Sequence, residues 1–195
     1  MIGISKIRIG KYIMFEKIDC TQAQQSQPHD DKVKVVTDFG LIKNNILGIE
    51  ENNMNRLLQN NTDLFVYFEG KVPVGMMWGH RGSCYIKGPR ISIYQNDDVV
   101  YLFWIYILPE YRQKGVFTKL KDFFFSYYNG MKGFTAFVSP TNEIMRNQLK
   151  KSGFVESKRL LYMNFWNKSF LFDKPLHRES IVRIESENKH NLPVI

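Results

Sequence analysis

The sequence predicts a mixed α/β fold, in which a sheet is flanked by helices. Short segments rich in β-branched and aromatic residues alternate with segments whose apolar residues recur at helical spacing. The 195 residues are enough for one domain with a substantial core. The composition, with 44% apolar and 24% charged residues, is typical of globular proteins.

The first half of the chain begins with a predicted strand at 11–18, which is rich in β-forming residues. A polar loop at 22–31 follows, and residues 42–58 have a broken helical pattern that indicates one or two short helices. A hairpin is expected at 64–80, because two β-forming segments flank the turn around Gly70.

The second half contains the strongest signals. Residues 81–98 are predicted to form a loop with a short strand at 90–94, and 99–108 is apolar on both faces, as in a central strand. The elements expected after it are a helix at 117–128, a strand at 134–138, a helix capped near Asn142 that ends at Gly153, and a strand pair at 154–157 and 160–166.

Composition and charge narrow the function classes. The longest apolar run, 99–108, is too short to cross a bilayer, and the N-terminal residues do not resemble a signal peptide. Cys20 and Cys84 have no metal-ligand spacing and are expected to be reduced thiols of a cytoplasmic protein. The net charge of +8 fits either an anionic partner or a solvated basic surface. No stretch interleaves basic and exposed aromatic residues as single-strand binders do, so we do not expect nucleic acid as partner. The shortness of the longest apolar run leads us to expect no membrane as partner.

One stretch, 101–125, carries the clearest functional signal. A β-forming run stops at Pro109, a polar turn with Gly115 follows, and a helical pattern begins directly after it. A turn of this kind places main-chain N–H groups at a helix N-terminus, where they can bind phosphate. The pattern therefore predicts a phosphorylated cofactor.

The turn sequence Pro-Glu-Tyr-Arg-Gln-Lys-Gly-Val at 109–116 resembles the acyl-coenzyme A signature of the GNAT N-acetyltransferase superfamily, Arg/Gln-x-x-Gly-x-Gly/Ala after a strand. A second element of that family, an asparagine followed by a helix and Gly-Phe, has its counterpart at Asn142 and Gly153-Phe154. The resemblance covers about 11–166. It implies a GNAT-like, mostly antiparallel sheet of six to seven strands in one domain at 1–166, with a partly packed or flexible extension at 167–195.

The resemblance also implies acetyl-CoA or another acyl-CoA as co-substrate, with no metal. In the family, N–H groups of the turn wrap the pyrophosphate, and a bulge frees main-chain groups of the preceding strand for the pantetheine and the thioester carbonyl. The corresponding cofactor-binding residues here are Ile105, Tyr106, Ile107, Arg112, Gln113, Lys114, Gly115, Val116, Phe117, Thr118 and Asn142. Lys119, Arg146 and Lys150 could screen the phosphates or be plain surface charges.

Two positions depart from the family pattern. Phe117 stands where the signature has its final glycine or alanine, so its ring would crowd the turn unless it turns into the core. Leu149 stands where many members carry the tyrosine that protonates the leaving thiolate. Either another group supplies that proton, or the thiolate leaves without a dedicated acid, which its low basicity permits.

The predicted catalytic residues are His80 and Tyr106. His80 ends the second hairpin strand, near the place where the family's acceptor pocket opens, and is either the general base or a surface histidine. Tyr106 either lines the acceptor channel or packs in the core. His29, His177 and His190 are scattered, which does not favour a metal site.

The function that the resemblance implies is N-acyl transfer from acyl-CoA to a primary amine, by direct attack in a ternary complex. Aromatic residues near the predicted pocket favour a small-molecule acceptor such as an amino sugar, and the fold analogy allows a homodimer. The alternatives are a catalytically silent GNAT-like module that binds CoA or serves in regulation, and a basic nucleic-acid-binding protein, which rests on net charge alone.

Overall fold

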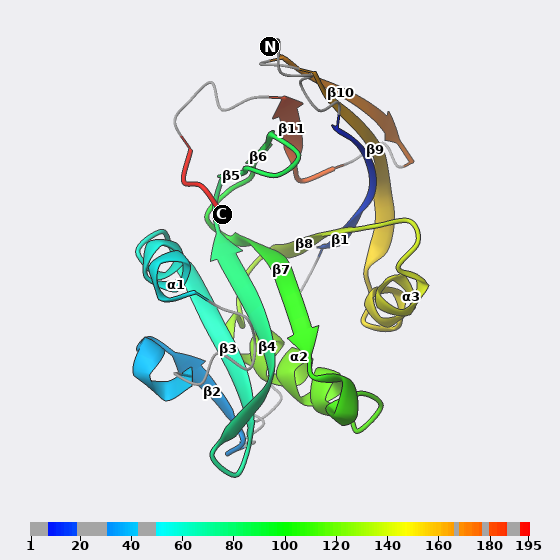
Figure 1. Cartoon of the computed structure of the whole chain (residues 1–195). Coiled ribbons are helices and arrows are strands. Elements are labelled where there is room, and N and C mark those ends of the chain that lie inside the picture. Colours follow the sequence, from blue (N-terminus) through cyan, green and yellow to red (C-terminus); the bar gives the residue numbers. More distant parts are fainter. Residues whose placement is uncertain (1–7, 19–30, 43–49, 166–167, 177–179, 187–191) are drawn as a thin grey trace, which may run out of the picture. The chain divides into compact units, whose positions relative to one another are not determined.

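The computed structural model describes residues 8–18, 31–42, 50–165, 168–176, 180–186 and 192–195 (Figure 1). These residues form two compact units that interleave along the chain. Unit 1 comprises Met1–Asp19, Gly82–Val99 and Lys132–Ile195, and unit 2 comprises Cys20–Arg81 and Val100–Met131. Most of the predicted loop at 22–31 and the first part of the predicted helical segment at 42–58 lie outside the described residues.

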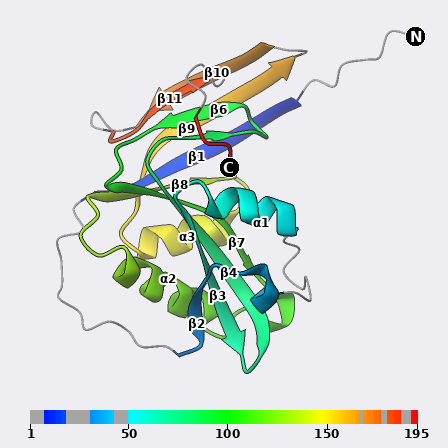
Figure 2. The ribbon, with the colours of Figure 1, turned by 90° about the vertical axis from the view of Figure 1, so that its left-hand side faces the viewer.

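Unit 2 contains an antiparallel sheet in the order β7-β4-β3-β2. Helices α1 and α2 lie on opposite sides of strands β3 and β4, so both strands are buried along most of their length (Figure 2). The elements of this unit are β2 (Val33–Val36), the 3₁₀ helix η1 (Phe39–Ile42), α1 (Glu51–Leu58), β3 (Thr62–Glu69), β4 (Val72–Arg81), β7 (Val99–Ile107), the 3₁₀ helix η2 (Pro109–Tyr111) and α2 (Val116–Tyr127).

Helix α2 lies close to the sheet because two glycines of β4 face it. Its buried residues Val116, Leu120 and Phe124 recur at helical spacing, and burying each side chain contributes about 1.5–3 kcal/mol. A Cβ at Gly75 would lie 2.9 Å from Cγ1 of Val116, and a Cβ at Gly79 would lie 2.8 Å from Cε2 of Phe124. Any larger residue at these two positions would push the helix away from the strand.

Unit 1 contains two sheets. The larger one has the order β10-β9-β1-β8, and the smaller one has the order β11-β6-β5. Every strand pair of these sheets with a described register is antiparallel. The elements of this unit are β1 (Arg8–Ile18), β5 (Cys84–Ile86), β6 (Ile91–Tyr94), β8 (Gly133–Val138), α3 (Glu143–Lys151), β9 (Val155–Phe165), β10 (Lys168–Pro175) and β11 (Arg183–Ser186).

Strand β1 lies between β8 and β9, and its two faces have different neighbours. On one face, Phe15 stands opposite Glu156, whose carboxylate binds residues of α3. On the other face, the Glu16 carboxylate accepts a 2.7 Å hydrogen bond from Oγ of Ser180, and Nζ of Lys158 donates to the main-chain oxygen of Val182 at 2.7 Å. Two buried ionisable side chains therefore hold residues 180–182 against the sheet.

The structure confirms the predicted class, a mixed α/β fold with a mostly antiparallel sheet. The helix predicted at 117–128 and the hairpin at 64–80 are present. The strand pair predicted at 154–157 and 160–166 is wrong, because one continuous strand, β9, covers both segments and pairs with β1 and β10. The described part of the extension after residue 167 forms strands β10 and β11.

Candidate functional site

Strand β7 contains the bulge that the resemblance implied. Phe103 pairs with Trp78 and Tyr106 pairs with Met76, so two residues of β7 stand against one residue of β4. The first of the two, Trp104, has a φ of 43°, which is rare for a residue other than glycine. The bulge therefore consists of Trp104 and Ile105 and changes the direction of the strand immediately before Tyr106 and Ile107. Ile105, Tyr106 and Ile107 are three of the predicted cofactor-binding residues, and all of them are half-buried.

The turn between β7 and α2 is held by local hydrogen bonds. The main-chain N–H of Leu108 donates to the oxygen of Val74 at 2.9 Å, and Nε of Arg112 donates to the oxygen of Ile107 at 3.1 Å. Two residues of the turn have positive φ, with 61° at Gln113 and 78° at Gly115, the N-cap of α2. A Cβ at Gly115 would meet no atom within 4 Å, so the space above this residue is open.

This turn presents unused donors. Among the described residues, no acceptor pairs with the main-chain N–H groups of residues 113–118, because the first turn of a helix has no partner for its own N–H groups. The helix dipole adds partial positive charge at the same end of α2. Arg112 and Lys114 are exposed beside the turn. We call residues 113–118 the cradle; its chemistry suits a phosphate or pyrophosphate.

Phe117 does not crowd Gly115, since none of its atoms lies within 4 Å of a Cβ placed there. Val116 turns into the core and is buried, whereas Phe117 is half-buried and Thr118 is exposed. The predicted residues from Ile105 to Thr118 thus lie on one continuous strand, turn and helix of unit 2.

Asn142, the remaining predicted cofactor residue, belongs to unit 1, where it caps α3. Its Oδ1 accepts a hydrogen bond from the main-chain N–H of Met145 at 3.1 Å. Its side chain is exposed, and its Nδ2 has no partner among the described residues. Leu149, further along α3, is 2% exposed, so the position that carries a tyrosine in many relatives is part of the core here.

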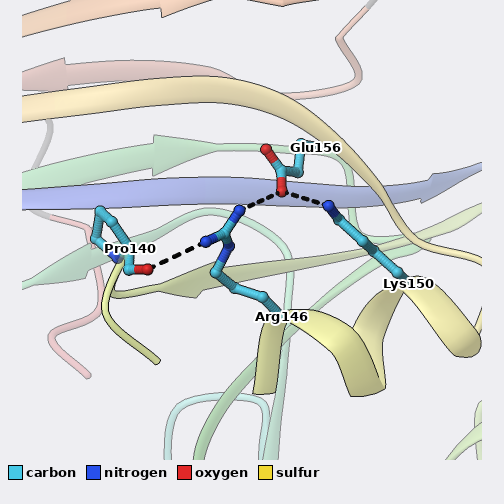
Figure 3. A network of polar contacts seen from close by, with 4 residues as sticks. All are labelled: Pro140, Arg146, Lys150 and Glu156. Atoms are coloured by element: carbon cyan, nitrogen blue, oxygen red, sulfur yellow. Dashed lines mark hydrogen bonds and ion pairs between the residues drawn. The ribbon is translucent and has the colours of Figure 1, made fainter. Parts of the chain in front are cut away.

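Two cations of α3, Arg146 and Lys150, are bound by the carboxylate of Glu156, which carries no distinctive signal in the sequence. Nη2 of Arg146 lies 3.0 Å from Oε1 of Glu156, and Nζ of Lys150 lies 2.8 Å from the same oxygen (Figure 3). Nη1 of Arg146 also donates to the main-chain oxygen of Pro140 at 3.1 Å. These contacts, the hydrogen bond from Lys150 first, hold the pKa of Glu156 below its usual value. Arg146 and Lys150 are therefore ion-paired within unit 1.

His80 and Tyr106 share a face of the unit 2 sheet but are not neighbours. His80 is 1% exposed, and its Nδ1 lies 2.9 Å from Oγ1 of Thr62. Tyr106 is half-buried and pairs with Met76, four residues before His80 on β4, which separates the two by about 13 Å along the sheet. His80 is therefore a buried, hydrogen-bonded side chain rather than the surface histidine of the alternative interpretation.

The remaining candidate features are the two cysteines, the other three histidines, a metal site and a membrane-spanning helix. Cys84 is a free, fully buried thiol, and burial raises its pKa far above the usual value. Cys20, His29, His177 and His190 lie outside the described residues. Within the described ranges, no three His, Cys, Asp or Glu side chains are grouped as a metal site would require. No described helix has the length and apolar character needed to span a membrane.

Several solved structures have a similar fold. A GNAT-family protein from Novosphingobium aromaticivorans matches with a TM-score of 0.56 at 10% identity, over 82% of this chain and 66% of its own. The aminoglycoside N-acetyltransferase AAC(6')-Iy, solved in complex with CoA, matches with a TM-score of 0.50 at 22% identity, over 70% of this chain and 98% of its own. A functionally unknown protein from Staphylococcus epidermidis matches with a TM-score of 0.52 at 12% identity, over 80% of this chain and 62% of its own.

These identities support the fold and not a shared substrate. The chain spans just under two thirds of the Novosphingobium and Staphylococcus proteins. A search of curated protein sequences found no match. The sequence model of the acetyltransferase (GNAT) family matches residues 36–154, which include β7, the cradle and Asn142. Because this match covers more than half of the chain, the chain belongs to the GNAT acetyltransferase family.

Proposed function

We propose that the protein transfers an acetyl or related acyl group from acyl-CoA to a primary amine. The observation that carries this proposal is the cradle, a set of unused N–H donors that directly follows a bulged strand. The family match supports acyl-CoA chemistry, and the pyrophosphate of coenzyme A is the anion that the cradle would bind.

In the proposed reaction the amine attacks the thioester carbonyl directly within a ternary complex. The nitrogen–carbon bond forms, the carbon–sulfur bond breaks, and the sulfur leaves as a thiolate while the amine loses a proton. Main-chain groups near the bulge would polarise the carbonyl, and fixed positioning of the two substrates would supply much of the rate. The buried Cys84 thiol, with its raised pKa, is not suited to form a covalent intermediate.

The case for a catalytic role is stronger for Tyr106 than for His80. Tyr106 is half-buried and directly follows the bulge, so its hydroxyl is the better candidate to contact a substrate. His80 would have to act through a water chain, because its ring is 1% exposed. Leu149 supplies no acid, so the thiolate would leave without a proton from that position.

The acceptor we propose is a small-molecule amine. Support comes from the neighbour whose name describes aminoglycoside acetylation, and from the exposed Trp104 ring, which stacks on Trp78 beside the bulge. The rival function, a silent CoA-binding module, is favoured by the apolar, buried Leu149.

Two measurements separate these functions. Saturating acetyl-CoA should stabilise the full chain by a few kcal/mol in thermal unfolding, since a ligand at about 100 times its Kd contributes about 2.7 kcal/mol. No stabilisation would refute both functions. Release of free CoA thiol in the presence of a panel of amines, amino sugars and peptides should then exceed the amine-free rate. Stabilisation without amine-dependent CoA release would favour the silent module.

A further inference from the structure

A cavity lies within unit 1, on strands β1, β9 and β10 beside the start of α3. Its volume is about 540 Å³, within the range of small-molecule sites. Its lining includes the cations Lys11, Arg159 and Lys174, all exposed. Its lining includes no residue of the cradle and neither His80 nor Tyr106, although it includes Arg146, one of the cations considered above for the CoA phosphates.

The strand register places these cations together on one face of the sheet. Ile13 pairs with Arg159, and Arg159 pairs with Lys174 on the next strand. Lys11 is two residues before Ile13, so it shares this face. Asp173, the only acidic residue of the lining, alternates with Lys174 along β10 and its side chain belongs to the opposite face. The face with the cavity therefore carries three positive charges.

The charges of Lys11, Arg159 and Lys174 have no ion-pair partner among the described residues. Arg159 and Lys174 stand directly opposite each other, and like charges in this position destabilise a strand pair. An anion bound between them would remove this repulsion, so the arrangement is typical of a binding surface.

The remaining walls of the cavity are rigid or apolar. Arg146 borders it with a guanidinium that is fixed between Glu156 and Pro140 (Figure 3). The buried Nε of Arg146 has no hydrogen-bond partner among the residues that the structure describes. Leu161 and Phe172 are cross-strand partners on the cation-bearing face, and Phe172 is 58% exposed. The cavity thus combines positive charge with an open aromatic surface.

We propose that this cavity binds a small phosphate monoester that carries a planar or apolar body. A phosphate monoester carries a charge of about −1.5 to −2 at neutral pH, which suits the three cations better than a single carboxylate does. Lys11, Arg159 and Lys174 would bind the phosphate, and Phe172 and Leu161 would contact the body. A polycationic amine would be repelled. This site does not depend on acyl transfer, because its lining includes no residue of the cradle and neither His80 nor Tyr106.

The test uses the full chain without acyl-CoA and phenyl phosphate as the probe, followed by calorimetry or NMR titration. We expect saturable binding that weakens as salt concentration rises, with benzoate and inorganic phosphate binding more weakly. Arg159→Gln and Lys174→Gln should each weaken binding by roughly tenfold or more, because each removes a charge-assisted hydrogen bond. Lys168→Gln is the matched control: Lys168 is an exposed cation on the same strand and face, about 20 Å from Lys174.

Several outcomes would overturn the proposal. The first is that phenyl phosphate does not bind, and the second is that the wild type and the three glutamine variants bind it with equal affinity. The third is that benzoate binds as tightly as phenyl phosphate. The fourth is that a variant loses CoA binding in parallel with phenyl phosphate binding. Gly115→Ala separates this site from the cradle, because it should leave phenyl phosphate affinity unchanged. Unfolding in urea serves as the folding control. Lys174→Gln should be at least as stable as the wild type, since it removes the repulsion with Arg159.

Discussion

Gly115→Ala tests whether the cradle binds acyl-CoA. Gly115 has a φ of 78°, so an alanine there is strained and should lower the free energy of unfolding by about 1–2 kcal/mol. Its methyl group would also stand in the open space through which an anion must approach the N–H groups of the cradle. Losing one charge-assisted hydrogen bond costs about 1.5–3 kcal/mol, which corresponds to a Kd for CoA roughly ten- to hundredfold higher.

Gly70→Ala is the matched control. Gly70 lies in the β3–β4 turn with a φ of 62°, and a Cβ there would also meet no atom within 4 Å. The two variants should therefore lose similar stability in urea, while only Gly115→Ala weakens CoA binding in calorimetry. Equal CoA affinity in both variants would refute the assignment of the cradle as the pyrophosphate site.

Three further predictions follow from buried and ion-paired groups. His80→Ala should lower the free energy of unfolding in urea by about 1–3 kcal/mol, because it leaves a cavity and removes the buried hydrogen bond between the His80 ring and the Thr62 hydroxyl; if the variant retains activity with an unchanged pH profile, His80 is not the general base. Glu156→Gln should be less stable than the wild type at pH 7. The pKa of Glu156 is lowered in the folded state, so this difference should shrink as the pH falls below 4.5, the ordinary value, and a constant difference from pH 7 to pH 3 would contradict the ion-pair network. Cys84, studied in a Cys20→Ser background, should react with a thiol reagent at pH 8 only after unfolding, because burial raises its pKa; rapid labelling of the folded protein would show that the thiol is accessible.

Local signals in the sequence predicted the elements that build the cradle. Pro109, Gly115 and the helical spacing after it are enough to place a strand, a turn and a helix, because each signal acts within a few residues. The bulge at Trp104 could be expected only from the family resemblance, since no glycine marks it.

Pairing between distant segments could not be predicted in the same way. The residue pattern of β1 predicts a strand, but it does not predict that β8 and β9 are the strands that pair with it. Lys158 and Arg159 interrupt the apolar pattern and suggested a turn, yet Lys158 is buried within β9 because the oxygen of Val182 satisfies its ammonium group. The cation cluster of Lys11, Arg159 and Lys174 becomes visible only once the register is known.

The central place of β1 has a consequence for synthesis of the protein on the ribosome. Ile13 pairs with Val138 and Arg159, so more than a hundred further residues must emerge before either edge of this strand is paired. The β3–β4 hairpin can close as soon as it is made, because its partners are adjacent in sequence. Folding of unit 1 is therefore expected to be slow and late, and β1 is exposed to chaperones or to misassociation until β8 and β9 have been made.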